Sequence, residues 1–178
     1  IQFDFAELPA AIHEQLRATL LKHVLQFGRG PQPVLTQLCL AVASLALHME
    51  AWASPVTDLV AAMTAPADEA LAKLPCLLAL LTVLPEEAEN MTVGVVPRRR
   101  DDFRAALAAA GPTVIKLLAQ VHAQCQASAS HMGAALRCLA SWMRSSPPSF
   151  ALIQSPPPLG SAFSAPRPPL TPAPPPAA

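Results

Sequence analysis

Apolar and polar residues recur along residues 9–144 with the spacing of helices. The segment 9–27 begins with Pro9 and is followed by Gly28, the proline-first and glycine-last arrangement typical of a helix. The next segment, 33–49, carries leucines outside its main apolar face, which predicts a helix buried on more than one side. The first segment instead has one apolar stripe, formed by Ile12, Leu16, Leu20, Val24 and Phe27.

A second pair of predicted helices follows, again with the more apolar helix second. Ser54 and Pro55 suit the N-cap and the first turn of a helix over 55–64. A mostly apolar run at 71–84 comes next, and Pro85 is predicted to end it. The run is too short to span a membrane, which takes about 20 apolar residues. Its leucines favour a buried helix over a strand.

A third pair completes the pattern. The segment 98–126 predicts a helix that breaks or kinks near Gly111 and Pro112, and 131–144 predicts another mostly apolar helix. Three pairs, each with a more polar helix before a more apolar one, are typical of helical repeats of about 40–47 residues. The prediction is an all-α, HEAT-type α-solenoid, in which each hairpin packs only on its neighbours.

Composition favours helices and gives the chain no net charge. Aromatic residues make up 4% of the chain and tyrosine is absent, whereas strands favour aromatic and β-branched side chains. Twelve basic and twelve acidic residues cancel, so no global field attracts nucleic acid or a membrane surface. The cysteines are widely spaced and no secretory signal precedes them, which favours reduced thiols. Because the chain begins with Ile1 and not Met, we expect a piece of a longer product.

The composition changes at Ser145. Residues 145–178 are rich in Pro, Ala and Ser, with Arg167 as the only charge, and we expect this tail to be disordered or polyproline II. The predicted organisation is therefore a helical region at 5–144 followed by a tail at 145–178. A PxxP ligand around Pro166 is an alternative use of the tail, although such matches arise by chance in proline-rich runs.

Three blocks of sequence carry a family resemblance. They are "LTQLCLAVASLALHMEAW" at 35–52, "LPCLLALLTVLPEE" at 74–87 and "RCLASWM" at 137–143, in that order. With "FAELP" at 5–9 and the arginines at 98–100, the region from Phe5 to Met143 resembles the transportin-3 and importin-13 family of nuclear import receptors. The resemblance implies a HEAT-repeat solenoid of the exportin-1/importin-β type, shuttling between nucleus and cytoplasm.

The resemblance also implies partners. It predicts binding of the GTPase Ran in its GTP form, of nucleoporins and of protein cargo such as serine/arginine-rich splicing factors, with no enzymatic activity and no cofactor. In the family the amino-terminal repeats meet Ran mainly through their inner helices. This points to polar positions on those helices, namely Gln37, Ser44, Arg137 and Ser141.

Two charged clusters are further candidates for a partner surface. Glu86, Glu87 and Glu89 are predicted to form an acidic turn, and Arg98, Arg99 and Arg100 a basic one. Solvated loops between helices are the simpler interpretation. Partner binding is the alternative, because loops presented by a rigid scaffold often carry function.

The sequence gives little support for a metal site or for a catalytic cysteine. His122, Cys125, His131 and Cys138 are spaced too loosely for the four converging ligands of a zinc site, so no metal is predicted. Cys76, with His48 or His122 as a base, is the candidate nucleophile, but it lies in a leucine run and a reactive cysteine needs an accessible, electropositive setting. The alternative to a transport receptor is a generic helical-repeat scaffold or adaptor that uses its proline-rich tail.

Overall fold

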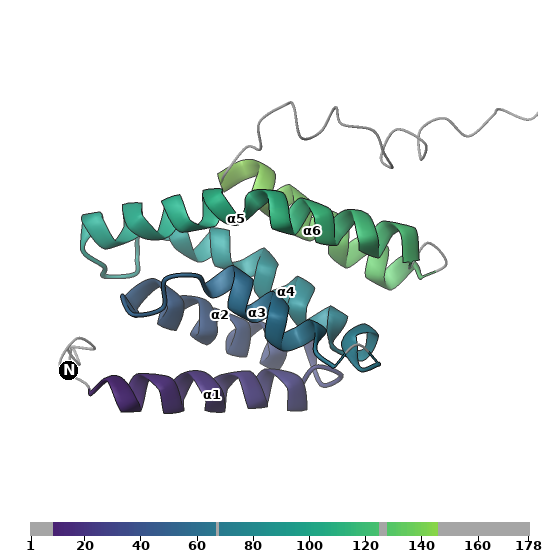
Figure 1. The fold of residues 1–178 in the computed structure, drawn as a ribbon, viewed down its shortest axis with the longest axis horizontal. Helices are drawn as coiled ribbons and strands as arrows, with labels where there is room; N and C mark the ends of the chain where they lie inside the picture. Colours follow the sequence, from purple (N-terminus) through teal and green to yellow (C-terminus); the bar gives the residue numbers. More distant parts are fainter. Residues whose placement is uncertain (1–8, 67, 125–127, 146–178) are drawn as a thin grey trace, which may run out of the picture.

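The computed structural model describes residues 9–66, 68–124 and 128–145. Within these residues the chain forms six α-helices and no strand, as predicted (Figure 1). The helices are α1 (Ala10–Gln26), α2 (Gln32–His48), α3 (Pro55–Thr64), α4 (Ala70–Glu89), α5 (Pro97–Gln124) and α6 (Ala129–Ser145).

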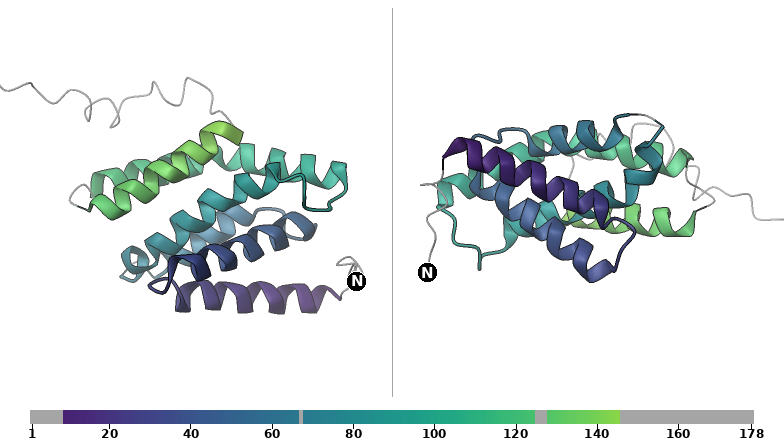
Figure 2. Two further views of the ribbon diagram at one scale, coloured as in Figure 1. Left: turned by 180° about the vertical axis from the view of Figure 1, so that it is seen from behind. Right: turned by 90° about the horizontal axis from the view of Figure 1, so that it is seen from below.

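The six helices form three hairpins stacked in two layers. Helix α1 packs on α2, α3 on α4, and α5 on α6. Helices α2, α4 and α6 also pack side by side and make a second-helix layer, while α1, α3 and α5 form a first-helix layer (Figures 1 and 2). Hairpin stacked on hairpin in this way is the arrangement of a HEAT-type α-solenoid, so the predicted fold class is confirmed.

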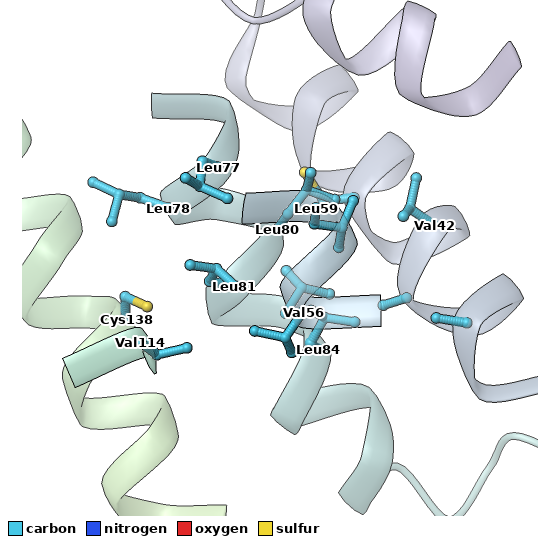
Figure 3. Close-up of a cluster of buried hydrophobic side chains, with 14 of the residues drawn as sticks. Val42, Val56, Leu59, Leu77, Leu78, Leu80, Leu81, Leu84, Val114 and Cys138 are labelled. Atoms are coloured by element: carbon cyan, nitrogen blue, oxygen red, sulfur yellow. The ribbon is translucent and has the colours of Figure 1, made fainter. Parts of the chain in front are cut away.

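Helix α4 is the centre of the core. It contacts each of the other five helices, and 11 of its 20 residues are buried. Leucines on different sides of α4 point toward different neighbours: Figure 3 shows Leu80 and Leu84 near α3 residues and Leu78 on the side of Cys138. Burial over most of its circumference explains why the run at 71–84 has few polar residues.

Helix α1 lies at one end of the stack and is the least buried. Its apolar stripe packs on α2 through Val24, which is fully buried, but Ile12 and Leu16 stay 42% and 38% exposed. Where α1 ends, the chain passes close to α4: a Cβ on Gly28 would collide with the Sγ of Cys76. Gly28 has no positive φ, so the glycine meets a need for space and not for a left-handed backbone.

Pro85 does not end its helix, and the predicted stop is wrong. Helix α4 continues through Pro85 to Glu89. Proline has no N–H, so the carbonyl of Leu81, four residues earlier, loses its helical donor in a buried site. The indole Nε1 of Trp142, on α6, donates to this carbonyl at 2.7 Å. At the next residue along α4, the carbonyl of Thr82 accepts from the hydroxyl of Ser141 at 2.8 Å.

The break predicted near Gly111 and Pro112 is also wrong, because α5 is one continuous helix with Pro112 inside it. Here the carbonyl that lacks a donor belongs to Ala108, which is exposed. Water can pair an exposed carbonyl without help from another element. A proline is therefore tolerated in both helices, with a side-chain donor in α4 and solvent at α5.

The cluster Arg98–Arg100 forms the first turn of α5, as the predicted helix over 98–126 implies. The interpretation of the cluster as a solvated loop between helices is wrong. Arg99 reaches the end of α2, where its Nε donates to the carbonyl of Leu47 at 2.9 Å and its Nη2 to those of Ala46 and Met49. Helix ends leave carbonyls without intrahelical donors, and a cation there also interacts favourably with the helix dipole. Arg99 thereby caps a helix about 50 residues earlier in the chain.

Arg100 does the same for α4. It is 5% exposed, and it donates to the carbonyls of Ala88 and Val93 at 2.7 and 2.8 Å. The acidic residues are likewise not in a turn but in the last turn of α4. Glu87 is buried and Glu89 pairs with Arg104 of α5 at 2.8 Å. Arg100 and Glu89 therefore join α4 to α5.

We predict that Trp142 and Pro85 are energetically coupled. Trp142→Phe removes the donor for the Leu81 carbonyl and should lower the free energy of unfolding by about 1–3 kcal/mol. Pro85→Ala restores a backbone N–H for that carbonyl, so the same Trp142→Phe change should cost about 1 kcal/mol less in the Pro85→Ala background. Urea unfolding of the four proteins measures the coupling. Trp52→Phe is the control: its effect should be equal in both backgrounds, and equal effects of Trp142→Phe would contradict the coupling.

The three adjacent arginines should differ in their effects on stability. Arg100→Met removes the Arg100 donors from the carbonyls of Ala88 and Val93, of which the Val93 carbonyl still accepts from the N–H of Val95, and it should lower the free energy of unfolding by about 1–3 kcal/mol. Arg98→Met is the matched control: Arg98 is exposed, and its replacement should change stability by less than about 0.5 kcal/mol. Thermal or urea unfolding compares them, and similar effects at both positions would refute the capping role of Arg100.

Candidate functional site

The candidate site is the solvent-facing side of the second-helix layer. On each of its helices, the more exposed residues recur at alternating intervals of three and four, which places them on one stripe. The opposite side of the layer is covered by α1, α3 and α5, so the three stripes face outward together. They consist of Gln37, Ala41, Ser44 and His48 on α2, Ala72, Pro75, Ala79, Thr82 and Glu86 on α4, and Ser130, Gly133, Arg137, Ala140 and Arg144 on α6.

Four of the residues predicted from the sequence lie on this outward face. Gln37, Glu86 and Arg137 are exposed, and Ser44 is half-buried. The other residues of the three stripes are mostly small. The polar side chains therefore project from a surface of small side chains on α2, α4 and α6. A protein partner that contacts this face would meet all three hairpins at once, because each hairpin contributes one of its helices.

Other predicted residues lie elsewhere. Ser141 is on α6 but fully buried, since its hydroxyl bonds to α4. Glu87, Arg99 and Arg100 are used in packing, as described above. Arg98 is exposed at the start of α5, in the first-helix layer and away from the outward face. A role of these residues in partner binding stays a prediction, and Arg98 is the most accessible of them.

Two features of the outward face were missed in the sequence. The carboxylate of Glu86 pairs with Arg144 at 3.2 Å and so joins α4 to α6 across the face. Both side chains are largely exposed, and such pairs contribute little to stability. His48 donates through Nδ1 to the carbonyl of Ser44 at 2.8 Å, one turn earlier. The seven-residue spacing of Arg137 and Arg144, two turns of one helix, was the signal that could have found Arg144.

The first-helix layer has a separate hollow. It lies between the start of α3 and the middle of α5, with a volume of about 230 Å³. Its walls are built from small residues, four of them alanines, with Ser54, Thr57 and Thr113 as the polar members. Ser54 stands at the N-cap of α3, but its side chain makes no capping hydrogen bond. The hollow contains no charged group that would select a ligand.

The described cysteines are poor nucleophiles. Burial raises the pKa of the Cys39 thiol to about 12, with the nearby Cys76 adding to the effect. Burial likewise raises the pKa of Cys138 to about 12, and it raises the pKa of Cys76. A reactive cysteine needs the thiolate, and these shifts favour the neutral thiol. The Sγ of Cys76 instead faces the backbone carbonyl of Val24 at 3.6 Å, in the core.

The loose metal candidates are not brought together either. Cys125 lies outside the described residues, and Cys138 is buried in the core between α4 and α6. His131 pairs with the hydroxyl of Ser128, at the start of α6. In the part of the chain that the structure describes, no three His, Cys, Asp or Glu side chains form a group that could hold a metal ion.

One described helix, α5, is long and apolar enough to cross a membrane by length and composition alone. That test is weak evidence, because packed helices of other proteins also pass it. In this fold, Phe103, Leu107 and Val114 of α5 are buried against the other helices, and Arg99 and Arg100 at its start hold the ends of α2 and α4. The helix thus has a defined place in the stack.

Comparison with known proteins agrees with this architecture. The family described as Exportin 1-like protein matches residues 31–163. Importin-13 of Gallus gallus is 37% identical over 136 residues, which cover 74% of this chain and 14% of importin-13. Importin-13 of Mus musculus is 35% identical, covering 79% of this chain and 15% of that protein. Transportin MOS14 of Arabidopsis thaliana is 31% identical, covering 81% and 15%.

The chain thus spans about 15% of the length of these relatives. The family match crosses the boundary at 144 that composition predicts, and it includes 18 residues after Ser145. It also covers α2 to α6 in full, which are five of the six helices in the solenoid. The chain therefore belongs to the exportin-1-like, importin-β family, as its resemblance to transportin-3 and importin-13 implies.

Proposed function

We propose that this chain is part of a nuclear import receptor of the karyopherin-β type and contributes to its binding of Ran-GTP. The observation that carries the proposal is family membership over most of the chain, together with relatives named importin-13 and transportin. The receptor would carry protein cargo, such as serine/arginine-rich splicing factors, through the pore by way of nucleoporins. It would shuttle between nucleus and cytoplasm.

The outward face of the second-helix layer is the proposed Ran contact within this chain. Its polar residues Gln37, Ser44, Glu86 and Arg137 come from all three hairpins, so a partner bound there would be recognised through the stack and not through one helix. The charges on the face include both signs, with Glu86 beside Arg137 and Arg144. Mixed charge favours orientation and selectivity of a protein partner more than raw affinity.

The chain supports this role as a scaffold and not as a catalyst. Its described cysteines are held as neutral thiols in the core. Repeat proteins bind through extended surfaces that are assembled from many hairpins. We therefore propose that the isolated chain holds only part of the Ran contact and binds Ran weakly.

A chimeric receptor tests the proposal. The chain replaces its matching region in chicken importin-13, and circular dichroism checks that the chimera is folded. Titration with Ran in each nucleotide state should give clear preference for the GTP form, with little binding by the isolated chain. If the folded chimera ignores Ran-GTP while unmodified importin-13 binds it, the receptor assignment fails for this segment, and the scaffold or adaptor is the better interpretation.

We predict that a charge reversal on the outward face weakens the chimera. Arg137→Glu should raise the Kd for Ran-GTP about tenfold, equivalent to about 1.4 kcal/mol, because it reverses an exposed charge inside the proposed contact. Lys116→Glu is the matched control, since it makes the same charge change at an exposed position on α5 in the first-helix layer. Calorimetric titration measures both. Equal Kd values for the two variants would remove the outward face from the Ran contact.

A further inference from the structure

Two arginines on α6 give one edge of the outward face a positive charge. Arg137 and Arg144 are both exposed, and they are the charged members of the α6 stripe. They are seven positions apart, so their Cα atoms lie about 10.5 Å apart along the same side of the helix. The α2 stripe contains no Asp, Glu, Lys or Arg. The positive charge of the face is therefore concentrated along α6.

The two guanidinium groups have different surroundings. The Nη2 of Arg144 lies 3.2 Å from Oε1 of Glu86, which is the one carboxylate among the stripe residues. Arg137 makes no ion pair or side-chain hydrogen bond with any residue that the structure describes. Its Nη1 lies 3.6 Å from the position that a Cβ on Gly133 would take, so the side chain runs back along α6. Arg137 is thus open to a ligand, while Arg144 is shared with a carboxylate of the chain itself.

Glu86 faces Arg144 because hydrogen bonds to the main chain fix α6 on α4. The side chains of Ser141 and Trp142 donate to two successive carbonyls of α4, at 2.8 and 2.7 Å. The ion pair lies about one turn further along both helices, so the same register places its two members opposite each other. The side chain of Arg144 is 72% exposed and that of Glu86 47%, and a pair as exposed as this contributes little to stability. The pair is therefore not needed to hold the two helices together.

We propose that Arg137 and Arg144 bind carboxylates of the protein partner on the outward face, and that Glu86 competes with the partner for Arg144. The inference rests on the proposed contact with Ran-GTP, and it adds the chemistry of the surface that Ran would present there, an acidic one. A guanidinium group matches a carboxylate and can donate two parallel hydrogen bonds to it. A nucleic acid is a poorer match, because the chain has no net charge and Glu86 would repel its phosphates.

The competition gives the two arginines different roles. A carboxylate of the partner can reach Arg137 without displacing another acid. At Arg144 it must replace Glu86, so the loss of the existing ion pair offsets part of the energy gained with the partner. Glu86 therefore weakens binding, and it does so most for a partner whose acidic group is poorly placed to displace it. Arg137 acts as the anchor, and Arg144 determines specificity.

Titration of the importin-13 chimera with Ran-GTP tests the competition. Glu86→Gln should lower the Kd about threefold, because it frees Arg144 and the energy of an exposed ion pair is small. Arg144→Gln should raise the Kd about threefold for the same reason. In the Arg144→Gln background, Glu86→Gln should change the Kd by less than about 1.5-fold, since no guanidinium group is left to release. Circular dichroism verifies that each variant is folded.

Glu14→Gln is the matched control. Glu14 is also exposed and pairs with an arginine, Arg17, at 2.6 Å, but it lies on α1 in the first-helix layer. Its replacement removes the same charge and the same kind of ion pair, so the Kd should equal that of the unmodified chimera.

The inference is overturned if Glu86→Gln raises the Kd or leaves it unchanged. It is also overturned if the gain from Glu86→Gln is as large in the Arg144→Gln background, or if Glu14→Gln gives the same gain. These outcomes require a chimera that binds Ran-GTP, and they leave the proposed function standing. A folded chimera that ignores Ran-GTP is the separate result that refutes the proposed function, and this inference with it.

Discussion

A carbonyl buried in an apolar core must find a donor, and for three such places in this fold the donor comes from the last described hairpin, α5 and α6. Pro85 leaves the Leu81 carbonyl unpaired inside the central helix, and Trp142 pairs it from α6. The ends of α2 and α4 raise the same need, and Arg99 and Arg100 of α5 meet it. Leucine packing is non-directional and would allow the hairpins to slide. Hydrogen bonds to these particular carbonyls are directional, so they fix which turn of one helix packs against which turn of its neighbour.

This constraint also separates what the sequence could predict from what it could not. Periodicity is local, so the six helices, their pairing and the limits of 55–64 followed from it. The errors at Pro85 and near Gly111 arose because a proline was judged by its own helix alone. For Pro85 the missing donor lies 57 residues later, and no local rule can supply it. The capping roles of Arg99 and Arg100 were missed for the same reason: their acceptors belong to segments that folding brings close.

The candidate site, too, could be predicted from the sequence only in its local features. The spacing of Gln37 and Ser44 on one helix, and of Arg137 on another, could be read from the sequence. Which side of each helix faces outward could not, because that depends on the neighbouring helices. Ser141 illustrates the limit: as a polar residue on an inner helix it resembled a contact residue, yet its hydroxyl is directed to α4. The partly exposed stripe of α1 is the converse case, in which an apolar pattern finds a partner along only part of its length.

The contact between Gly28 and Cys76 links two distant positions of the sequence during evolution. The first lies after α1 and the second on α4, and there is no space between them for a Cβ on the glycine. A change from glycine to a larger residue is therefore compatible with this packing only where the residue at 76 has become smaller or the hairpins have moved apart. In an alignment of related chains the two positions should covary, although they are separated by two intervening helices.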